Sequence, residues 1–266
     1  MPSTGAVGSL KRGVVVLKAL ASAGPGGLAL TQIAERCALP HSSAHRVLSQ
    51  LREAHLVRQD TPDGAYSLGP LAFELGVAAA QQFDIRGRSR PALITLATEL
   101  GDTVFLMMRS GSEAVCLEVE SGPAPIQVVT LRIGSRRPLG VGAAGLAILA
   151  AIEQPERDDM LSDVMGAVEH DWGITPQTLD ELIAQTRRQG FSHIENQITP
   201  GVAGVGMPIL DLFGQPIGSV GVAAPVSRMP TPRVREVADA VGRAVGHIQN
   251  RLFARGSRAK PSRRSS

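Results

Sequence analysis

The sequence lacks the features that disulfide-bonded, metal-binding and membrane-spanning proteins share. Its two cysteines, Cys37 and Cys116, lie too far apart for metal-ligand spacing, as expected of free thiols in a reducing compartment. No apolar run approaches the roughly 18 residues of a membrane-spanning helix. The first residues show no charged segment followed by an apolar one, so no secretory signal is expected. We expect a cytoplasmic globular protein that contacts no membrane.

Catalytic motifs are also missing. The six histidines are scattered along the chain, at His41, His45, His55, His170, His193 and His247. None belongs to an H-E-x-x-H motif or to a suggestive cysteine–histidine pair, and the chain has no G-x-S-x-G turn. The pattern therefore favours a protein that is not an enzyme and that needs no metal or cofactor.

Aromatic residues make up only 3% of the chain, whereas hydrophobic residues make up 43%. The cores must therefore consist mainly of alanine, valine, leucine and isoleucine. A length of 266 residues is about twice that of a typical domain, which predicts two domains.

Positive charge is concentrated at the two ends of the chain. Residues 1–69 carry seven Lys and Arg against four acids, whereas residues 70–254 carry fifteen against twenty. Residues 255–266 carry five basic residues and no acid, and their composition is typical of a disordered tail. This layout favours contact of the ends with a polyanion, although ordinary solvated surface charge explains it equally well.

The first 55 residues predict a helix followed by a bent pair of short helices. The expected helices are 10–20 with Ser9 as its cap, 31–37 with Thr31 as its cap, and a third from Ser42 or Ser43 to about His55. Leu10, Val14, Val15, Leu17 and Leu20 recur at helical spacing in the first. Pro40 cannot continue the second helix but suits the start of the third.

A tight pair of helices needs apolar inward positions and small residues where the helices cross. The inward positions are apolar: Ile33, Cys37, Leu39, Val47, Leu48 and Leu51. The crossing positions are Ala34 and Ala44. Ala38 stands in the turn where glycine is usual, and alanine costs more than glycine in a left-handed conformation. The combination is typical of a helix-turn-helix.

The outward face of the third helix is short, polar and free of carboxylates until Glu53. Such side chains can donate to phosphates and base edges in the major groove of duplex DNA, whereas a solvated helix face normally mixes acids with bases. Two short extended runs around a Pro-Asp-Gly turn then predict a hairpin wing, which Tyr66 either props on the core or links to phosphate. The predicted DNA-binding residues are His41, Ser42, Ser43, His45, Arg46, Gln50 and, in the wing, Arg58.

These residues resemble the IclR family of transcription regulators. The matching segments are LKRGVVVLKAL (10–20), LTQIAERCALPHSSAHRVLSQL (30–51), YSLG (66–69), RPLGVGAAGLA (137–147), RRQGFS (187–192) and PGVAGVGMPI (200–209). The resemblance covers nearly the whole chain in the expected order. It implies an α+β protein with an N-terminal winged helix-turn-helix and a C-terminal GAF-like domain that binds a small effector.

The resemblance also implies an assembly. Relatives are dimers or tetramers, and a helix between the domains, here expected within residues 70–83, aids dimerisation. Ser43, His45 and Arg46 match the S/T-x-H-R signature of the recognition helix. The expected domains are 1–69 for DNA binding, 70–83 as linker helix, 84–254 for the effector, and 255–266 as basic tail.

The pattern after residue 84 mixes helices and hairpin-linked strands, which predicts an antiparallel α+β domain. The expected helices are 91–100, 144–153, 157–165, 178–189 and 232–254. The expected strands are 103–109, 114–119, 126–133, 206–210 and 217–223. Asp171-Trp172-Gly173 is interpreted as a loop anchored by Trp172.

Gly140 to Gly145 fits the G-x-G-x-x-G dinucleotide motif, but six residues separate it from the expected strand before it. We therefore favour a different use. Small residues at a helix start leave backbone N–H groups open to an anion, and in the resembled family this loop faces the effector. Ala143, Ala144 and Gly145 are the expected backbone donors.

The pocket positions depart from the resembled family, in which relatives that bind small oxo-acids use an Asp, a Cys and two Ser. The corresponding positions here are Ile194 (or Glu195), Gly204, Gly221 and Ala223. Leu146 replaces a common lysine. We expect a roomier, apolar pocket for an aromatic, alicyclic or larger apolar acid, unless these small residues only pack the sheet tightly. The predicted effector-binding residues are Leu139, Val141, Ala143, Ala144, Gly145, Ile194, Gly204, Gly221 and Ala223.

The sequence thus predicts a regulator that binds a near-palindromic operator as a dimer or tetramer and is switched by a small organic acid. A single recognition helix reads only a few base pairs, so two copies are needed for specificity. The alternative is an architectural DNA-binding module without an effector.

Overall fold

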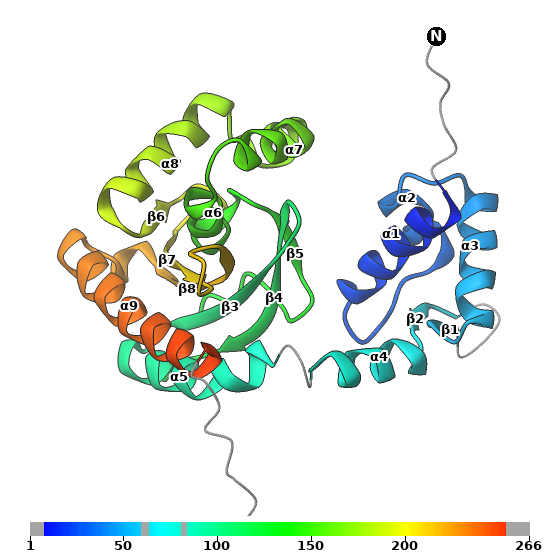
Figure 1. Cartoon of the computed structure of the whole chain (residues 1–266), viewed down its shortest axis with the longest axis horizontal. Helices are drawn as coiled ribbons and strands as arrows, with labels where there is room; N and C mark the ends of the chain where they lie inside the picture. Colours follow the sequence, from blue (N-terminus) through cyan, green and yellow to red (C-terminus); the bar gives the residue numbers. More distant parts are fainter. Residues whose placement is uncertain (1–7, 60–63, 81–83, 254–266) are drawn as a thin grey trace, which may run out of the picture.

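The computed structural model describes residues 8–59, 64–80 and 84–253 (Figure 1). The basic tail, the centre of the wing turn and the end of the linker lie outside these residues. The N-terminal part contains α1 (Ser9–Ala21), α2 (Leu30–Arg36), α3 (His41–Glu53), β1 (Val57–Gln59) and β2 (Tyr66–Leu68), followed by α4 (Pro70–Ala80).

The three helices and the hairpin of the N-terminal part enclose one small core. Ile33, Val47 and Leu48 are buried in it, as predicted, and Ala44 is fully buried where the helices cross. Tyr66 is only 7% exposed and pairs with Leu28 through backbone hydrogen bonds, so it props the wing on the core. The winged helix-turn-helix is confirmed.

The inward face of α1 differs from the prediction. Gly13, Val16 and Leu20 are buried, whereas Leu10 and Val14 are 82% and 43% exposed. A Cβ at Gly13 would stand 3.6 Å from the Leu51 side chain, so α1 approaches α3 closely at this glycine, while Val16 and Leu20 pack in the shared core.

The expected caps are wrong by one to three residues. Gly8, Ala29 and Pro40 occupy the N-cap positions of α1, α2 and α3, and none uses a side-chain cap of the expected kind. Instead, Gln32 Oε1 accepts from the Ala29 N–H at 2.9 Å. Ser9, Thr31, Ser42 and Ser43 therefore lie inside the helices.

The C-terminal part is a six-stranded antiparallel sheet between two layers of helices. Its elements are α5 (Ile85–Leu100), β3 (Thr103–Ser110), β4 (Glu113–Glu120), β5 (Arg136–Pro138), α6 (Gly142–Ala151), α7 (Glu156–Trp172), α8 (Pro176–Gln189), β6 (Ser192–Glu195), β7 (Val202–Leu210), β8 (Pro216–Pro225), the 3-10 helix η1 (Val226–Arg228) and α9 (Thr231–Phe253). The strand order is β5-β4-β3-β8-β7-β6, and every neighbouring pair is antiparallel.

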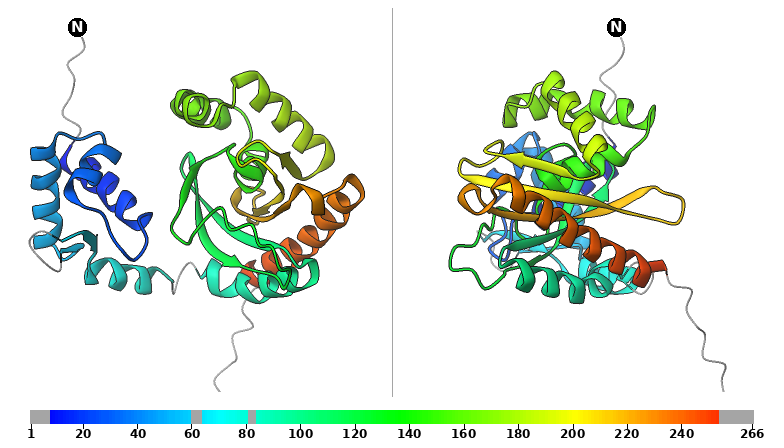
Figure 2. Two further views of the ribbon diagram at one scale, coloured as in Figure 1. Left: turned by 180° about the vertical axis from the view of Figure 1, so that it is seen from behind. Right: turned by 90° about the vertical axis from the view of Figure 1, so that its left-hand side faces the viewer.

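The alternation of side chains along the central strand creates two cores. Val104 and Leu106 of β3 point to the face covered by α5 and α9, and Phe105 and Met107 point to the face covered by α6, α7 and α8 (Figures 1 and 2). The second face matters for function, because α6 meets the sheet there by its N-terminal turn.

Several predicted elements are wrong. Residues 126–133 form no strand: the side chain of Gln127 donates to the carbonyls of Gly101 and Ala124, which ties this segment down as a loop. The edge strand is β5 instead. The sequence also missed the short strand β6, and Trp172 ends helix α7 rather than anchoring a loop. Helix α5 begins before Pro91, with Asp84 as its cap.

Polar contacts between described residues join the N-terminal part to the C-terminal part. Lys18 Nζ on α1 lies 2.8 Å from Glu113 Oε2, and Ser22 Oγ donates to the Gly134 carbonyl at 3.1 Å. Glu113 also accepts from Arg136 at 3.0 Å. The helix-turn-helix therefore touches the loop and strand edge that precede α6.

Within the described residues, no helix combines the length and apolar character needed to cross a membrane. The same residues bring together no group of three histidine, cysteine or acidic side chains that could hold a metal ion.

Candidate functional site

The outer face of α3 is the first candidate site. His41, Ser42, His45 and Arg46 are exposed, while the opposite side of the helix carries the buried residues of the core. Pro40 is the N-cap of α3 and follows shortly after the bend at Ala38. The φ of Ala38 is +48°, the left-handed conformation that the turn requires. The bend therefore turns this polar face outward.

The remaining predicted residues of this face are placed less freely. Ser43 is half-buried, and Gln50 is exposed but accepts a hydrogen bond from Ser9 Oγ at 3.1 Å. Arg58 lies on β1, where its Nε donates to Ser67 Oγ across the hairpin at 3.0 Å. An α-helix of this size fits the major groove, and α3 presents hydrogen-bond donors and positive charge without an acid before its last turn.

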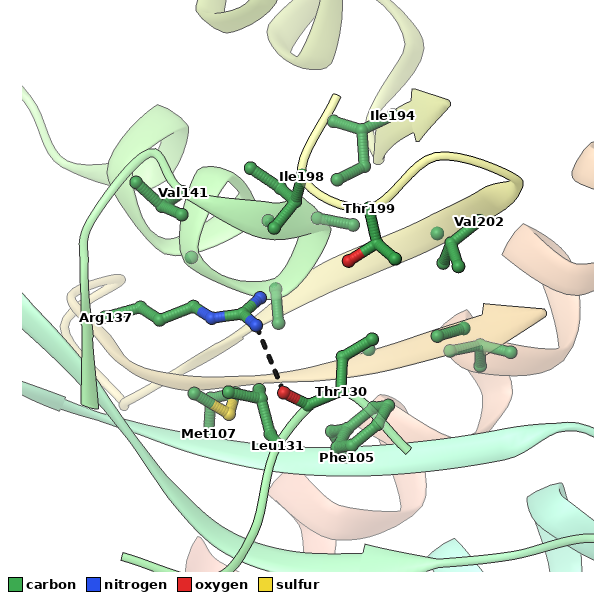
Figure 3. A pocket seen from close by; sticks show the side chains of 18 of the residues that line it. Phe105, Met107, Thr130, Leu131, Arg137, Val141, Ile194, Ile198, Thr199 and Val202 are labelled. Carbon is green, nitrogen blue, oxygen red and sulfur yellow. Dashed lines mark hydrogen bonds between the residues drawn. The ribbon is translucent and has the colours of Figure 1, made fainter. Parts of the chain in front are cut away.

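The second candidate site is a pocket between the N-terminal turn of α6 and the sheet (Figure 3). It is predominantly apolar. It is lined by Phe105, Met107, Thr130, Leu131, Arg137, Val141, Gly142, Ala143, Ala144, Gly145, Ile194, Ile198, Thr199, Val202, Ala203, Gly204, Gly221, Val222 and Ala223.

The structure brings eight of the nine predicted effector residues to this pocket. The lining includes Val141, Ala143, Ala144, Gly145, Ile194, Gly204, Gly221 and Ala223. Leu139 is not part of the lining; it is 1% exposed and packs in the core beneath α6. Glu195 is exposed, so Ile194 is the residue of β6 that faces the pocket.

Small residues set how closely α6 approaches the sheet. A Cβ on Gly221 would lie 2.9 Å from the Ala144 Cβ, and one on Gly206 would lie 2.7 Å from the Ala143 carbonyl oxygen. A Cβ on Gly204 would lie 3.3 Å from the Ala143 Cβ. Gly204 and Gly221 thus allow α6 to pack closely on the sheet and also line the pocket. Tight packing of the sheet and an apolar pocket, the two alternatives from the sequence, are therefore compatible.

Two buried serines fix the first turn of α6. Ser192 Oγ donates to the Ala143 carbonyl at 2.6 Å, and Ser219 Oγ donates to the Ala144 carbonyl at 2.9 Å. The helix has no side-chain cap at Val141. The residues of its first turn line the pocket, and the use of their N–H groups by an anion stays a prediction. The motif Gly140–Gly145 has no parallel βαβ context, because β5 pairs antiparallel with β4.

Arg137 is the charged residue among those lining the pocket that sequence reasoning missed. It comes from β5, and its guanidinium points into the pocket, where Nη2 donates to the Thr130 carbonyl at 3.1 Å (Figure 3). Its Cζ lies 5.2 Å from the centre of the Trp172 ring, within cation–π range. Burial lowers the pKa of Arg137. The sequence did hold a signal, since this arginine directly precedes the Pro138 of a matched motif.

The two cysteines have inert surroundings. Burial raises the pKa of the Cys116 thiol to about 12 and also raises that of Cys37. A thiolate is the reactive form, so neither residue is an activated nucleophile at neutral pH.

Known proteins match this chain along most of its length. The family described as bacterial transcriptional regulator IclR C-terminal matches residues 77–250, and the IclR helix-turn-helix domain matches residues 9–61. The chain belongs to the IclR family. It is therefore a transcriptional regulator with a helix-turn-helix and a C-terminal effector domain, and its curated relatives are regulators rather than enzymes.

Individual relatives agree with this assignment. The transcriptional repressor IclR of Escherichia coli (strain K12) is 29% identical over 93% of this chain and 90% of its own length. The regulator BhcR of Paracoccus denitrificans (strain Pd 1222) is 29% identical over 90% of this chain and 85% of its own. The crystal structure of a putative IclR regulator from Silicibacter sp. TM1040 superposes with a TM-score of 0.77, at 24% identity, over 92% of this chain and 96% of that one.

Proposed function

We propose that this IclR-family protein binds a near-palindromic operator through α3 and releases or tightens that grip when a small organic acid occupies the pocket under α6. Residues 1–69 bind DNA, 70–83 link, and 84–254 bind the effector, in the cytoplasm. The observation that carries the proposal is the exposed, acid-free outer face of α3, with His45 and Arg46 at its centre. The basic tail 255–266 adds sequence-independent attraction to DNA.

Self-association is part of the proposal, and α4 supports it. None of its residues is buried, yet Phe73, Leu75 and Val77 are 75%, 56% and 49% exposed. Covering an exposed apolar helix with a partner removes its surface from water and is therefore favourable. A second copy of this chain supplies the same apolar surface. A dimer or tetramer brings two recognition helices to two half-sites, which one copy cannot do.

The pocket supports a mainly apolar acid as effector. Its walls are built mainly from apolar and small residues, and the positions where relatives that bind small oxo-acids have polar residues correspond here to Ile194, Gly204, Gly221 and Ala223. An IclR homologue from Microbacterium hydrocarbonoxydans, 23% identical with a TM-score of 0.71 over 93% of this chain and the whole of that one, has been crystallised with 4-hydroxybenzoate, an aromatic acid. We infer the same broad ligand class here.

The contacts of α1 offer a route for coupling. Thr130 lines the pocket, and Gly134, four residues later in the same loop, accepts the hydrogen bond from Ser22, the C-cap residue of α1. A ligand that moves this loop changes the position of the helix-turn-helix relative to the C-terminal part. It shifts DNA affinity only if it binds the two placements with different affinity.

The DNA claim can be tested without knowing the operator. Duplexes selected from a random pool by the full-length protein would be titrated by fluorescence anisotropy with wild type, His45→Ala, Arg46→Ala and the control Arg188→Ala. Arg188 is exposed on α8, so its variant removes the same charge elsewhere. We expect the first two variants to lose about tenfold or more in affinity and the control to bind normally. Selection of no common sequence, or equal binding by all variants, would refute the proposal.

A further inference from the structure

Among the described residues that line the pocket, Arg137 alone carries a charge, and its surroundings differ from those of its neighbour. Arg136, beside it on β5, donates to Glu113 Oε2 at 3.0 Å. Successive residues of a strand point to opposite faces, so Arg136 and Arg137 lie on different sides of the sheet edge. Among the described residues, no carboxylate pairs with Arg137.

The groups that do contact Arg137 leave most of its hydrogen-bonding capacity unused. The Thr130 carbonyl accepts one N–H, and the Trp172 ring covers one face of the guanidinium. A guanidinium has five N–H donors in a planar fork. In the part of the chain that the structure describes, no acidic residue lines the pocket to balance its charge, and a desolvated charge without a counter-ion is costly.

We propose that Arg137 binds the anionic head of the effector and so restricts the ligand to small organic anions with an apolar body. This rests on the proposed function, which places the effector in this pocket. The planar fork matches a carboxylate through two parallel hydrogen bonds better than it matches a neutral amide. The apolar body then lies against side chains such as Phe105, Ile194 and Val202.

The pocket also limits the size and polarity of the ligand. The cavity has a volume of about 60 Å³, several times the roughly 10–15 Å³ that one water needs. This space suits a single ring or a short branched chain. Thr199 points its hydroxyl into the same space (Figure 3), where it can bond a second polar group of the ligand.

A purely structural role is the competing explanation. Arg137 links the 126–135 loop, through Thr130, to Trp172 at the end of α7, and such a clamp needs no ligand. The two roles differ in one measurable respect. Loss of a structural clamp would weaken the binding of charged and neutral ligands alike. Loss of an anion-binding arginine would weaken the binding of the charged ligand alone.

Matched acid and amide pairs test this directly. Benzoate, phenylacetate and cyclohexanecarboxylate, each with its amide, would be titrated into the full-length protein by calorimetry at pH 7.5. The proteins are wild type, Arg137→Gln, Arg137→Lys and the control Arg136→Gln. We expect wild type and Arg136→Gln to prefer at least one acid over its amide by about tenfold or more. In Arg137→Gln the preference falls to about twofold or less, and Arg137→Lys keeps part of it.

Each outcome decides a different claim. If acids are preferred equally in wild type and Arg137→Gln, or if wild type binds amides as tightly as acids, the assignment of Arg137 is overturned while an apolar ligand in this pocket stands. If no member of the panel binds wild type, the proposed effector class falls, and the role of Arg137 falls with it. If Arg137→Gln does not fold, Arg137→Lys decides, because an unchanged acid affinity and preference in that variant contradicts recognition by the planar fork.

Discussion

The outer face of α3 and the pocket under α6 both present positive charge, but they do so in opposite surroundings. Arg46 and its neighbours stand in water, where each contact with a phosphate is weak and screened by salt. Arg137 stands in an apolar pocket without a carboxylate partner among the described residues, where a single anion is distinguished strongly from a neutral molecule. The first arrangement suits a long polyanion and the second a small acid.

The largest expected effect concerns the contact of Arg46 with DNA. Arg46→Ala should lower affinity for the selected duplex by about tenfold or more. The plot of log affinity against log salt should become shallower by about one for each phosphate that the side chain no longer neutralises. Anisotropy titrations at several salt concentrations measure both quantities. A weaker affinity with an unchanged salt slope would instead indicate that Arg46 contacts a base.

The next effect concerns the packing of α6 against the sheet at the pocket. In Gly221→Ser the new Cβ would stand 2.9 Å from the Ala144 Cβ, so α6 must shift. We expect effector binding to fall by about tenfold or more while DNA affinity without effector stays within about twofold. Gly166→Ala on α7 is the control, because its added Cβ meets nothing within 4 Å. Unchanged acid binding by Gly221→Ser would show that α6 does not position the ligand.

A smaller effect concerns the connection between the two regions. Lys18→Met removes one of the two basic partners of Glu113, the one on α1, but leaves both α3 and the pocket lining intact. We expect wild-type affinity for the acid and a changed ratio of DNA affinities with and without it, by about two- to fivefold. Calorimetry and anisotropy on the same preparation measure the two. An unchanged ratio would mean that this ion pair does not couple the domains.

The smallest effect concerns pH and His193, next to the pocket residue Ile194. Burial lowers the pKa of His193, although nearby Glu195 opposes the shift. The unfolded chain therefore takes up a proton at higher pH than the folded one. The free energy of unfolding falls as pH drops through about 6.5 toward the lowered pKa. We expect a small loss of stability between pH 7.5 and 5.5, and His193→Gln should lose less. An equal loss in both proteins would assign it to other groups.

The sequence predicted the two regions unequally, and the reasons are physical. The helix-turn-helix is specified locally, by Ala38 and Pro40 at the bend and by small and apolar residues at fixed spacing, so its pattern can be read without tertiary information. Loop glycines and small residues likewise indicated the pocket wall. Residues 126–133 alternate like a strand, yet the hydrogen bonds of the Gln127 side chain hold them as a loop.

Arg137 was missed for a different reason. Nothing local distinguishes it from Arg136, and only the sheet pairing shows that one pairs with Glu113 while the other faces the pocket. The serines that tether α6, Ser192 and Ser219, lie far from it in the sequence and were missed in the same way. Contacts between distant segments decide these roles.

Histidine labelling with diethylpyrocarbonate, read by mass spectrometry with and without the selected duplex, tests most directly that α3 contacts DNA. His41 and His45 are exposed on α3, and His170 is exposed on α7, far from it in the sequence. We predict that DNA slows the labelling of His41 and His45 severalfold and leaves that of His170 unchanged. Equal labelling of His41 and His45 in the free protein and in the saturated complex would contradict the account.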